Sequence, residues 1–357
     1  MLLAEGIRFA DRQRFDYAYG YLLPGKNAVV PSLIAAGADV TCFAAGGNVA
    51  IALSPGRIAA QLRRLGVHLL HCHLPVAGVV GRVAGRLAGV PVVYTEHNVM
   101  ERYRRVTRRL NLLTWKWQDR VIAVSQGAAD SIRTRADAQV PVDVIPNGVD
   151  AGRFRRNGMD GERVRADLGI PTDAPVIGTV AIFREQKRLQ DWLEAARLLG
   201  ERHRDAHFIL VGDGPLHDRV AGLVNTLRLG NIVHLPGLRE DVRPYLAAMD
   251  VYMISSQFEG LPVALLEAMA MECAVVATAV GGIPEVVGAG DCGMLVDPGR
   301  PDLLAAAASS LLASRAGLRS RGQSARYIVE SRFSLGQMVR RVEATYAEVV
   351  EQHRYAG

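Results

Sequence analysis

The sequence predicts an α/β protein made of two doubly wound domains that face each other across a cleft. One reason is size, because 357 residues with 49% hydrophobic content are too many for one ordinary core and enough for two. The other reason is pattern, because short apolar runs alternate with longer helical segments along the whole chain. This alternation is typical of parallel sheets with helices on both faces, which bind ligands at the carboxyl ends of their strands.

Twelve apolar runs are the predicted strands. In the first half they are FDYAYGYLL, ADVTCF, VHLLHC, VPVVYT, RVIAVS and VDVIP; in the second they are PVIGTVAIF, HFILVGDG, NIVHLP, VYMISS, CAVVATA and CGMLVD. Residues 147–162, rich in glycine, asparagine and charge, predict a linker between domains at 1–150 and 151–335. Residues 336–357 are helical in pattern, and we expect this helix to pack back toward the N-terminal domain.

Several classes of protein are disfavoured by the composition. No apolar run reaches the length of a membrane span, and the first residues lack the features of a secretory signal, which predicts a cytoplasmic chain. The four cysteines show no CxxC spacing, so a disulfide framework or structural zinc site is not expected; they are Cys42, Cys72, Cys273 and Cys292. We expect reduced, mostly buried thiols. A nicotinamide dehydrogenase is disfavoured because no GxGxxG opens either sheet.

Positive charge is concentrated in the first half. Residues 1–155 contain 20 Lys+Arg and 11 Asp+Glu, a balance of +9, and the remaining 22 and 25 give −3. The excess peaks in MERYRRVTRRLNLLTWKWQDR, where arginines alternate with apolar residues at helical spacing. Residues 101–120 could contact an anionic membrane surface, or form a solvated helix face whose apolar side lies in the core; the second interpretation is slightly favoured. Nucleic acid is not expected as a partner, because no binding motif accompanies the patch.

The stretch FEGLPVALLEAMAM contains two glutamates around a strand-to-helix loop. Pro262 suits the first helical position because it has no N–H to lose, and the amides of residues 261–264 form an anion site suited to a nucleotide diphosphate. Glu267 lies one turn further on, whereas Glu259 stays on the loop. Each carboxylate needs hydrogen-bond donors near a diphosphate, and sugar hydroxyls are suitable donors. The candidate nucleotide-binding residues between them are Gly260, Leu261, Pro262 and Val263.

This stretch resembles the E-x7-E signature of retaining glycosyltransferases of family 4, which have the two-domain fold called GT-B. VIPNGVD, VGDGP, HLPGLREDVRPYLAAMDVYMISS and TAVGGIPEVVGAGDCGMLVDPG occur in the order and spacing of that family, from about Arg14 to Glu348. The resemblance implies two Rossmann-like domains, the first binding an acceptor and the second a UDP- or GDP-sugar. It also implies a reaction that needs no metal or other cofactor, with a glycan, a lipid-linked sugar or a small molecule as acceptor.

The resemblance also implies roles for individual residues. Glu267 would bind the ribose of the donor and Glu259 the sugar being transferred. Lys187 matches the family's diphosphate-binding lysine, but Ile182 stands at the usual arginine position, so Arg184 is the candidate replacement. Fixed cations there would stabilise the charge that the leaving group gains. A surface salt bridge is the alternative for Arg184.

His97 follows a predicted strand, where the family has a histidine near the transferred sugar. His71 and His73 share one side of another strand and are expected to pack rather than bind metal. Three further positions complete the implied nucleotide site: Gly212, Gly214 and Arg239. The two glycines would let the backbone approach the base, or could merely form turns, and Gly281 and Gly282 are equally ambiguous.

Two other activities are compatible with these motifs. One is a non-catalytic protein that binds nucleotide sugars, and the other is a sugar-nucleotide 2-epimerase of similar fold. The start of the chain departs most from the family, which begins with a strand and a glycine-rich loop, whereas MLLAEGIRFADRQ reads as the following helix. We therefore expect a shortened product with a gap in the first sheet, exposed apolar surface and little transferase activity, whose second domain still binds nucleotide.

Overall fold

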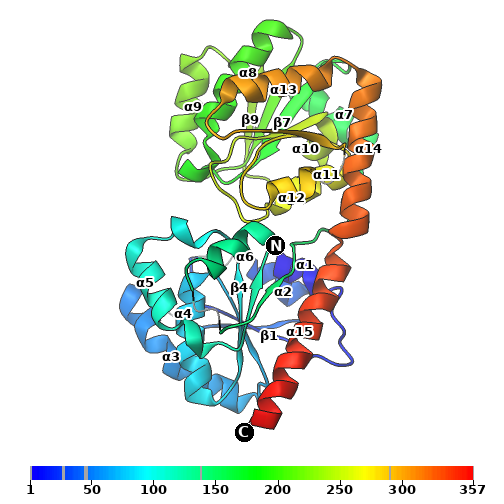
Figure 1. Cartoon of the computed structure of the whole chain (residues 1–357). Helices are drawn as coiled ribbons and strands as arrows, with labels where there is room; N and C mark the ends of the chain where they lie inside the picture. The colour runs from blue at the N-terminus through cyan, green and yellow to red at the C-terminus, as the bar shows by residue number, and fades with distance from the viewer. Residues whose placement is uncertain (1, 26–28, 44–46, 137–138, 289–290, 357) are drawn as a thin grey trace. The chain divides into compact units, whose positions relative to one another are not determined.

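The computed structural model describes residues 2–25, 29–43, 47–136, 139–288 and 291–356. The chain divides into two compact units (Figure 1). Unit 1 comprises Met1–Gly148 and Leu335–Gly357, and unit 2 comprises Val149–Ser334. Both units are α/β with parallel strands, and all twelve predicted strands are present.

Unit 2 contains one six-stranded parallel sheet. Its strands are β7 (Val176–Val180), β8 (His207–Val211), β9 (Val233–Gly237), β10 (Val251–Ile254), β11 (Ala274–Thr278) and β12 (Gly293–Val296). The strand order is β12-β11-β10-β7-β8-β9, so the direction of winding reverses between β7 and β10. The carboxyl ends of these two strands form the switch point at which doubly wound sheets bind ligands.

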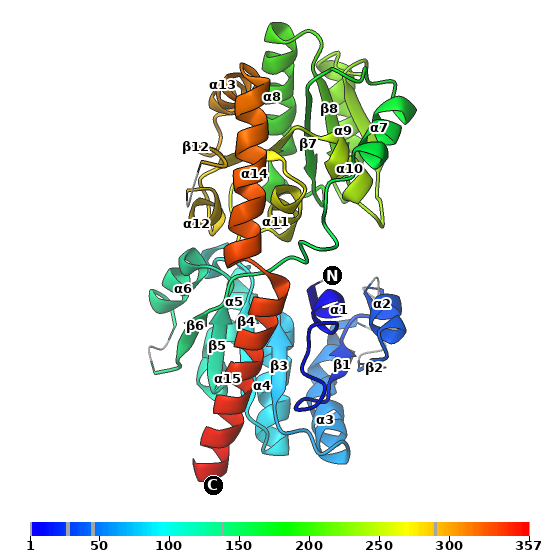
Figure 2. The same cartoon turned by 90° about the vertical axis from the view of Figure 1, so that its right-hand side faces the viewer.

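Helices cover both faces of this sheet (Figure 2). They are α7 (Gly158–Asp167), α8 (Leu189–Arg202), α9 (His217–Thr226), α10 (Arg243–Ala248), α11 (Val263–Ala270), α12 (Ile283–Val287), α13 (Pro301–Leu312) and α14 (Arg315–Arg332), with the 3-10 turn η3 (Glu185–Lys187). The apolar side chains of α8, α9 and α13 join those of the strands in one core, in which Trp192 is fully buried. Its indole N–H donates to the carbonyl of Met253 at 3.0 Å, which fixes α8 on β10.

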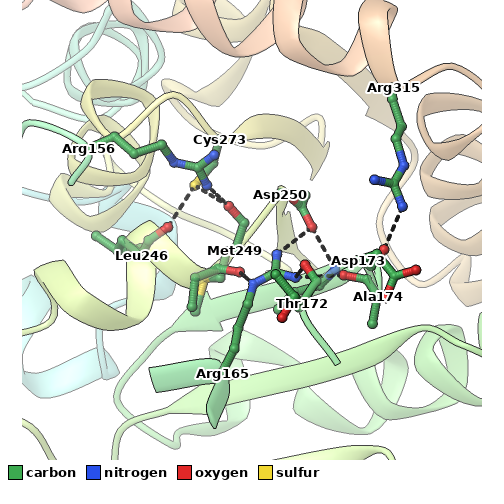
Figure 3. A network of polar contacts seen from close by, with 12 residues as sticks. Arg156, Arg165, Thr172, Asp173, Ala174, Leu246, Met249, Asp250, Cys273 and Arg315 are labelled. Atoms are coloured by element: carbon green, nitrogen blue, oxygen red, sulfur yellow. Dashed lines mark hydrogen bonds and ion pairs between the residues drawn. The ribbon is translucent and has the colours of Figure 1, made fainter. Parts of the chain in front are cut away.

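A polar network joins α7 to the amino ends of β7 and β10, opposite the switch point (Figure 3). The guanidinium of Arg165 donates to the carbonyls of Ala248 (3.1 Å) and Ala174 (2.8 Å) and to the Asp250 carboxylate (2.9 Å). The same carboxylate accepts the N–H of Val176 at 2.8 Å. The guanidinium of Arg165 therefore joins α7 to two other segments, the loop before β7 and the loop before β10.

Replacing Arg165 with methionine should destabilise unit 2 by about 2 to 3 kcal/mol, because a half-buried carboxylate and two carbonyls lose their charged donor. Urea unfolding would measure the change. Arg163→Met is the matched control, since this residue lies on the same helix but is exposed. Equal stability of the two variants would contradict the prediction.

Unit 1 contains two separate parallel sheets. β1 (Ala18–Tyr21) pairs with β2 (Asp39–Cys42), and the other sheet has the order β3 (Leu70–His73), β4 (Val92–Glu96), β5 (Arg120–Ala123), β6 (Val142–Val144). Within the described ranges no ladder joins β1 to β3. The two sheets are therefore separate between β1 and β3, the region in which a gap in the first sheet is expected, and that expectation stays a prediction.

Helices on both sides of these sheets complete unit 1. They are α1 (Leu2–Gly6), α2 (Val30–Ala35), α3 (Gly47–Arg64), α4 (Pro75–Ala88), α5 (Arg105–Leu113), α6 (Gln126–Arg133) and α15 (Leu335–Ala356), with the 3-10 turns η1 (Met100–Arg102) and η2 (Trp115–Trp117). Ile58 and Leu62 of α3 pack on Val80 of α4. On α15, Val349 joins the core formed by the sheet, so the C-terminal helix belongs to unit 1.

The structure corrects three predictions. The segment 147–162 is not a simple linker, because Asn157 caps α7 with its side chain and Phe154 is buried. Pro262 is the N-cap of α11 rather than its first residue. Most of the apolar side of α5 does not lie in the core, since Val106 is 70% and Leu113 74% exposed, although Leu112 packs against the core.

The expectation that most cysteines are buried is confirmed for Cys72, Cys273 and Cys292. Over the part of the chain that the structure describes, no helix is long and apolar enough to cross a bilayer.

Candidate active site

A small pocket lies at the switch point of the unit 2 sheet. Its lining comes from the ends of two strands, from η3 and from the start of α11, and includes Thr179, Val180, Lys187, Ser256, Pro262 and Ala264. A larger hollow of about 430 Å³ lies beside β12 and α13. We favour the smaller pocket as the active site, because the larger one is bordered by none of the predicted site residues and offers only the charge of Asp297.

An ion pair joins two predicted site residues at this pocket. The ammonium of Lys187 lies 2.5 Å from the carboxylate of Glu259, which also accepts the hydroxyl of Ser256 at 2.7 Å. Glu259 is only 6% exposed, so both donors stabilise a carboxylate that has lost most of its water. Sequence reasoning placed Lys187 and Glu259 on different parts of a ligand and missed Ser256 entirely.

Backbone contacts hold these two side chains together. The hydroxyl of Ser255 donates to the carbonyl of Lys187 at 2.8 Å, and the N–H of Gln257 donates to the carbonyl of Gln186 at the same distance. These two hydrogen bonds join the loop after β10 to η3. They bring Lys187 of η3 close to Glu259 of the loop.

Gly281 fixes the other side of the Glu259 loop. Its φ is +56°, and a Cβ atom there would lie 1.9 Å from the carbonyl oxygen of Glu259. The next residue, Gly282, donates its N–H to the carbonyl of Gly260 at 2.6 Å. Only glycine allows this approach, so the ambiguous glycine pair has a structural role in positioning the loop.

Glu267 lies on α11 and is only 3% exposed. Burial raises the pKa of the neighbouring Tyr252 phenol, and the negative charges of Glu267 and Glu259 raise it further. The neutral Tyr252 hydroxyl donates to the carbonyl of Val180 at 3.1 Å. It thus links β10 to β7 where the two strands end beside the pocket.

The remaining predicted residues of unit 2 lie on loops. Arg184 and Ile182 are exposed, and among the described residues no hydrogen bond or ion pair involves the guanidinium of Arg184, so it is available to a ligand. Gly212 and Gly214 have φ values of +135° and +159° and press against the backbone of residues 181–183, which accounts for both glycines without a ligand. Arg239 is exposed, with its guanidinium 5.5 Å from the ring centre of Tyr245.

Three histidines form a chain at the ends of β3 and β4 in unit 1. Nδ1 of His73 lies 2.9 Å from Nε2 of His97, and the rings of His71 and His73 are 4.2 Å apart. His71 in turn contacts the hydroxyls of Thr95 (2.7 Å) and Tyr346 (2.5 Å). In the described ranges no group of three His, Cys, Asp or Glu residues is placed to hold a metal ion. The partnership of His73 with His97 was missed because it joins two strands.

Burial keeps these imidazoles neutral. It lowers the pKa of His97 to about 4 and that of His71 to about 3, where the neighbouring His97 adds to the effect. The pKa of His73 also falls well below its ordinary value, through burial and both neighbours. Burial has the opposite effect on the adjacent carboxyl of Glu96 and raises its pKa to about 7, although four hydrogen-bond donors, among them the hydroxyls of Tyr103 and Tyr94, counteract the rise.

These shifts predict that acid destabilises unit 1. Between pH 6.5 and 4 the three histidines bind protons in the unfolded state but stay neutral in the folded state. The free energy of unfolding therefore falls as the pH falls. Glu96 opposes the loss, because its folded carboxyl takes up a proton between pH 7 and 4.5, but it is one group against three. We expect a net loss on the order of 2 kcal/mol. Urea unfolding would measure this change. The free energy of unfolding of His73→Asn should depend less on pH than that of the wild type, whereas His353→Asn, at an exposed position, should match the wild type.

Comparison with known proteins identifies the family. Residues 25–153 match the family described as Glycosyltransferase Family 4, and residues 174–314 match Glycosyl transferases group 1. The chain is 30% identical over 313 residues to alpha-maltose-1-phosphate synthase of Mycolicibacterium smegmatis, with 79% of each chain covered.

Two further similarities are informative. Over 221 residues, 56% of this chain and 54% of the other, it is 30% identical to the Escherichia coli UDP-Gal:alpha-D-GlcNAc-diphosphoundecaprenol alpha-1,3-galactosyltransferase. The crystal structure of Anabaena Alr3699/HepE in complex with UDP-glucose superposes with a TM-score of 0.87 at 23% identity, covering 97% of this chain and 95% of that one. This chain therefore belongs to glycosyltransferase family 4, and its two α/β units have the GT-B fold.

Proposed function

We propose that this protein is a retaining glycosyltransferase that moves a hexosyl group from a UDP- or GDP-sugar to a carbohydrate or lipid-linked acceptor. The observation that carries the proposal is the Lys187–Glu259 pair in the pocket at the switch point, beside the start of α11. A cation, a hydrogen-bonding carboxylate and a helix N-terminus are the groups that a nucleotide sugar requires. The named ligand of the Anabaena structure favours a UDP-sugar among the candidates.

In this proposal unit 2 binds the donor. The diphosphate lies against Lys187, Arg184 and the backbone amides of Gly260, Leu261 and Val263, and Glu267 accepts hydrogen bonds from the ribose. As the glycosidic bond breaks, negative charge grows on the departing diphosphate, and the fixed cations stabilise it without a metal ion. Glu259 exchanges part of its bonding to Lys187 for a hydroxyl of the transferred sugar.

The acceptor belongs to unit 1, where His97 is the candidate contact with the transferred sugar. Retention requires the acceptor hydroxyl to attack the face from which the nucleotide leaves. The departing phosphate oxygen then takes the proton of that hydroxyl, so the new glycosidic bond forms as the old one breaks. Four cysteines that form no disulfide favour action in the cytoplasm, and we place the protein at the inner face of the membrane through residues 101–120.

A thermal-shift panel of UDP, GDP, ADP and their sugars tests donor binding, since a ligand that binds only the folded state stabilises it by about 2.7 kcal/mol at a concentration of 100 Kd. We expect a uridine or guanosine diphosphate to raise Tm most. NMR of the product then reports the configuration at the anomeric carbon. Failure of every nucleotide to shift Tm would overturn the donor site, and an inverted product would overturn retention. Interconversion of the free nucleotide sugar without an acceptor would instead identify an epimerase.

A further inference from the structure

α5 exposes three of its four large apolar residues to the outside of unit 1. Val106, Leu110 and Leu113 are 70%, 47% and 74% exposed, and Trp117 in the following turn is 39% exposed. The spacing of Val106, Leu110 and Leu113 places these three along one stripe of α5, and Trp117 follows four residues later in η2. Large apolar side chains gathered on one exposed helix face mark an interaction surface rather than ordinary surface composition.

The opposite face of α5 is held by a buried cation. Arg82 of α4 is fully buried and donates to the side chains of Asn111 (2.7 Å) and Thr114 (3.0 Å). Its guanidinium also lies 5.3 Å from the ring centre of Trp115. These bonds place Asn111 and Thr114 on the inward side of the segment, together with Leu112, which packs against the core of unit 1. The guanidinium is only partly satisfied, because its Nη2 atom has no hydrogen-bond partner among the described residues. Val106, Leu110 and Leu113 are left on the outward side of α5.

Cations surround the stripe. The segment from Arg102 to Gln118 contains six Lys and Arg residues and no carboxylate. Arg104, Arg105 and Arg109 are exposed, and none of them has an ion pair with the described residues. A seventh cation, Arg86 of α4, lies 5.2 Å from the ring centre of Trp117. The surface therefore combines apolar side chains with the positive charges of Arg104, Arg105 and Arg109, which no carboxylate of the described residues pairs.

We propose that this face of α5 and η2 docks onto an anionic lipid bilayer. Val106, Leu110, Leu113 and Trp117 enter the boundary between headgroups and acyl chains, while the arginines contact lipid phosphates. Binding of nucleic acid would explain the cations but not the apolar stripe. Binding of a second copy of the chain would place its six cations against the six of the first copy, which repel each other. A bilayer of acidic lipids can bind both the apolar side chains and the cations. The inference deepens the proposed function, because a membrane-bound enzyme can reach a lipid-linked acceptor. Only this link to the acceptor rests on the proposed function.

Cosedimentation of the full chain with vesicles tests the proposal without donor or acceptor, so its outcome is independent of transferase activity. We expect binding to vesicles of phosphatidylcholine with about one-third phosphatidylglycerol, weak binding to phosphatidylcholine alone, and loss of binding at high salt. The double variant Arg105→Glu/Arg109→Glu should bind at least about tenfold more weakly. Val106→Ser/Leu113→Ser should do so too.

The matched control lies on α3, where Leu53 is also 70% exposed and Arg57 is exposed. Leu53→Ser/Arg57→Glu should bind as the wild type does. Equal binding of the α5 variants and the wild type would overturn the proposal, as would equal binding to neutral and acidic vesicles. If the wild type were a dimer by analytical ultracentrifugation and Val106→Ser/Leu113→Ser a monomer, the stripe would be a contact between copies and the proposal would also fail.

Discussion

Replacing Lys187 with alanine should lower kcat by about two to three powers of ten, the effect of removing one fixed donor from a developing anion. The lysine is a partly buried cation that lines the pocket, and its ammonium is already positioned 2.5 Å from Glu259. The measurement is the rate at which nucleoside diphosphate is released from the donor that the binding panel identifies. Lys187→Arg keeps the charge and should recover part of the rate.

Two variants separate the role of Lys187 from that of its neighbours. Arg184→Ala should also lower the rate by about two to three powers of ten if this exposed arginine replaces the one absent at Ile182. A near-normal rate for Arg184→Ala beside an inactive Lys187→Ala would show that the lysine acts alone. Lys187→Ala/Glu259→Gln removes both charges of the pair, so its urea stability shows whether an uncompensated carboxylate, rather than lost catalysis, explains the single variant.

The architecture could be predicted because its signals are local. β11 is buried at every position, and its sequence AVVAT is a short β-branched run between a helix end and a glycine pair. The loop containing Glu259 could be placed for the same reason, since a strand ends before it and a helix begins after Pro262. The spacing of apolar residues and the position of turn-forming residues are enough to predict such elements.

Contacts between distant segments could not be predicted in this way. Lys187 and Glu259 are 72 residues apart, and their pairing depends on backbone bonds that fasten η3 to the loop after β10. The orientation of α5 is a second case. Its periodicity shows an apolar stripe, but which face turns inward is decided by the buried guanidinium of Arg82 on another helix. Apolar spacing alone favoured the wrong side.

Replacing Glu267 with glutamine should weaken binding of the nucleoside diphosphate by about 1 to 3 kcal/mol, or roughly 5- to 150-fold in Kd, as expected when a buried hydrogen bond loses its charge. The carboxylate is 3% exposed on α11, so water cannot replace the lost interaction. Glu259→Gln should instead act mainly on turnover. Calorimetric titration of both variants would distinguish the two glutamates.

The assignment of Glu267 to the ribose permits a stricter test with a 2′,3′-dideoxy nucleoside diphosphate. If the carboxylate accepts ribose hydroxyls, the dideoxy ligand should bind the wild-type protein about as weakly as the normal ligand binds Glu267→Gln. Combining the two changes should then add little further loss, because both remove the same interaction. Fully additive losses would mean that Glu267 stabilises the pocket without touching the ribose, and unchanged affinity in Glu267→Gln would remove it from the donor site altogether.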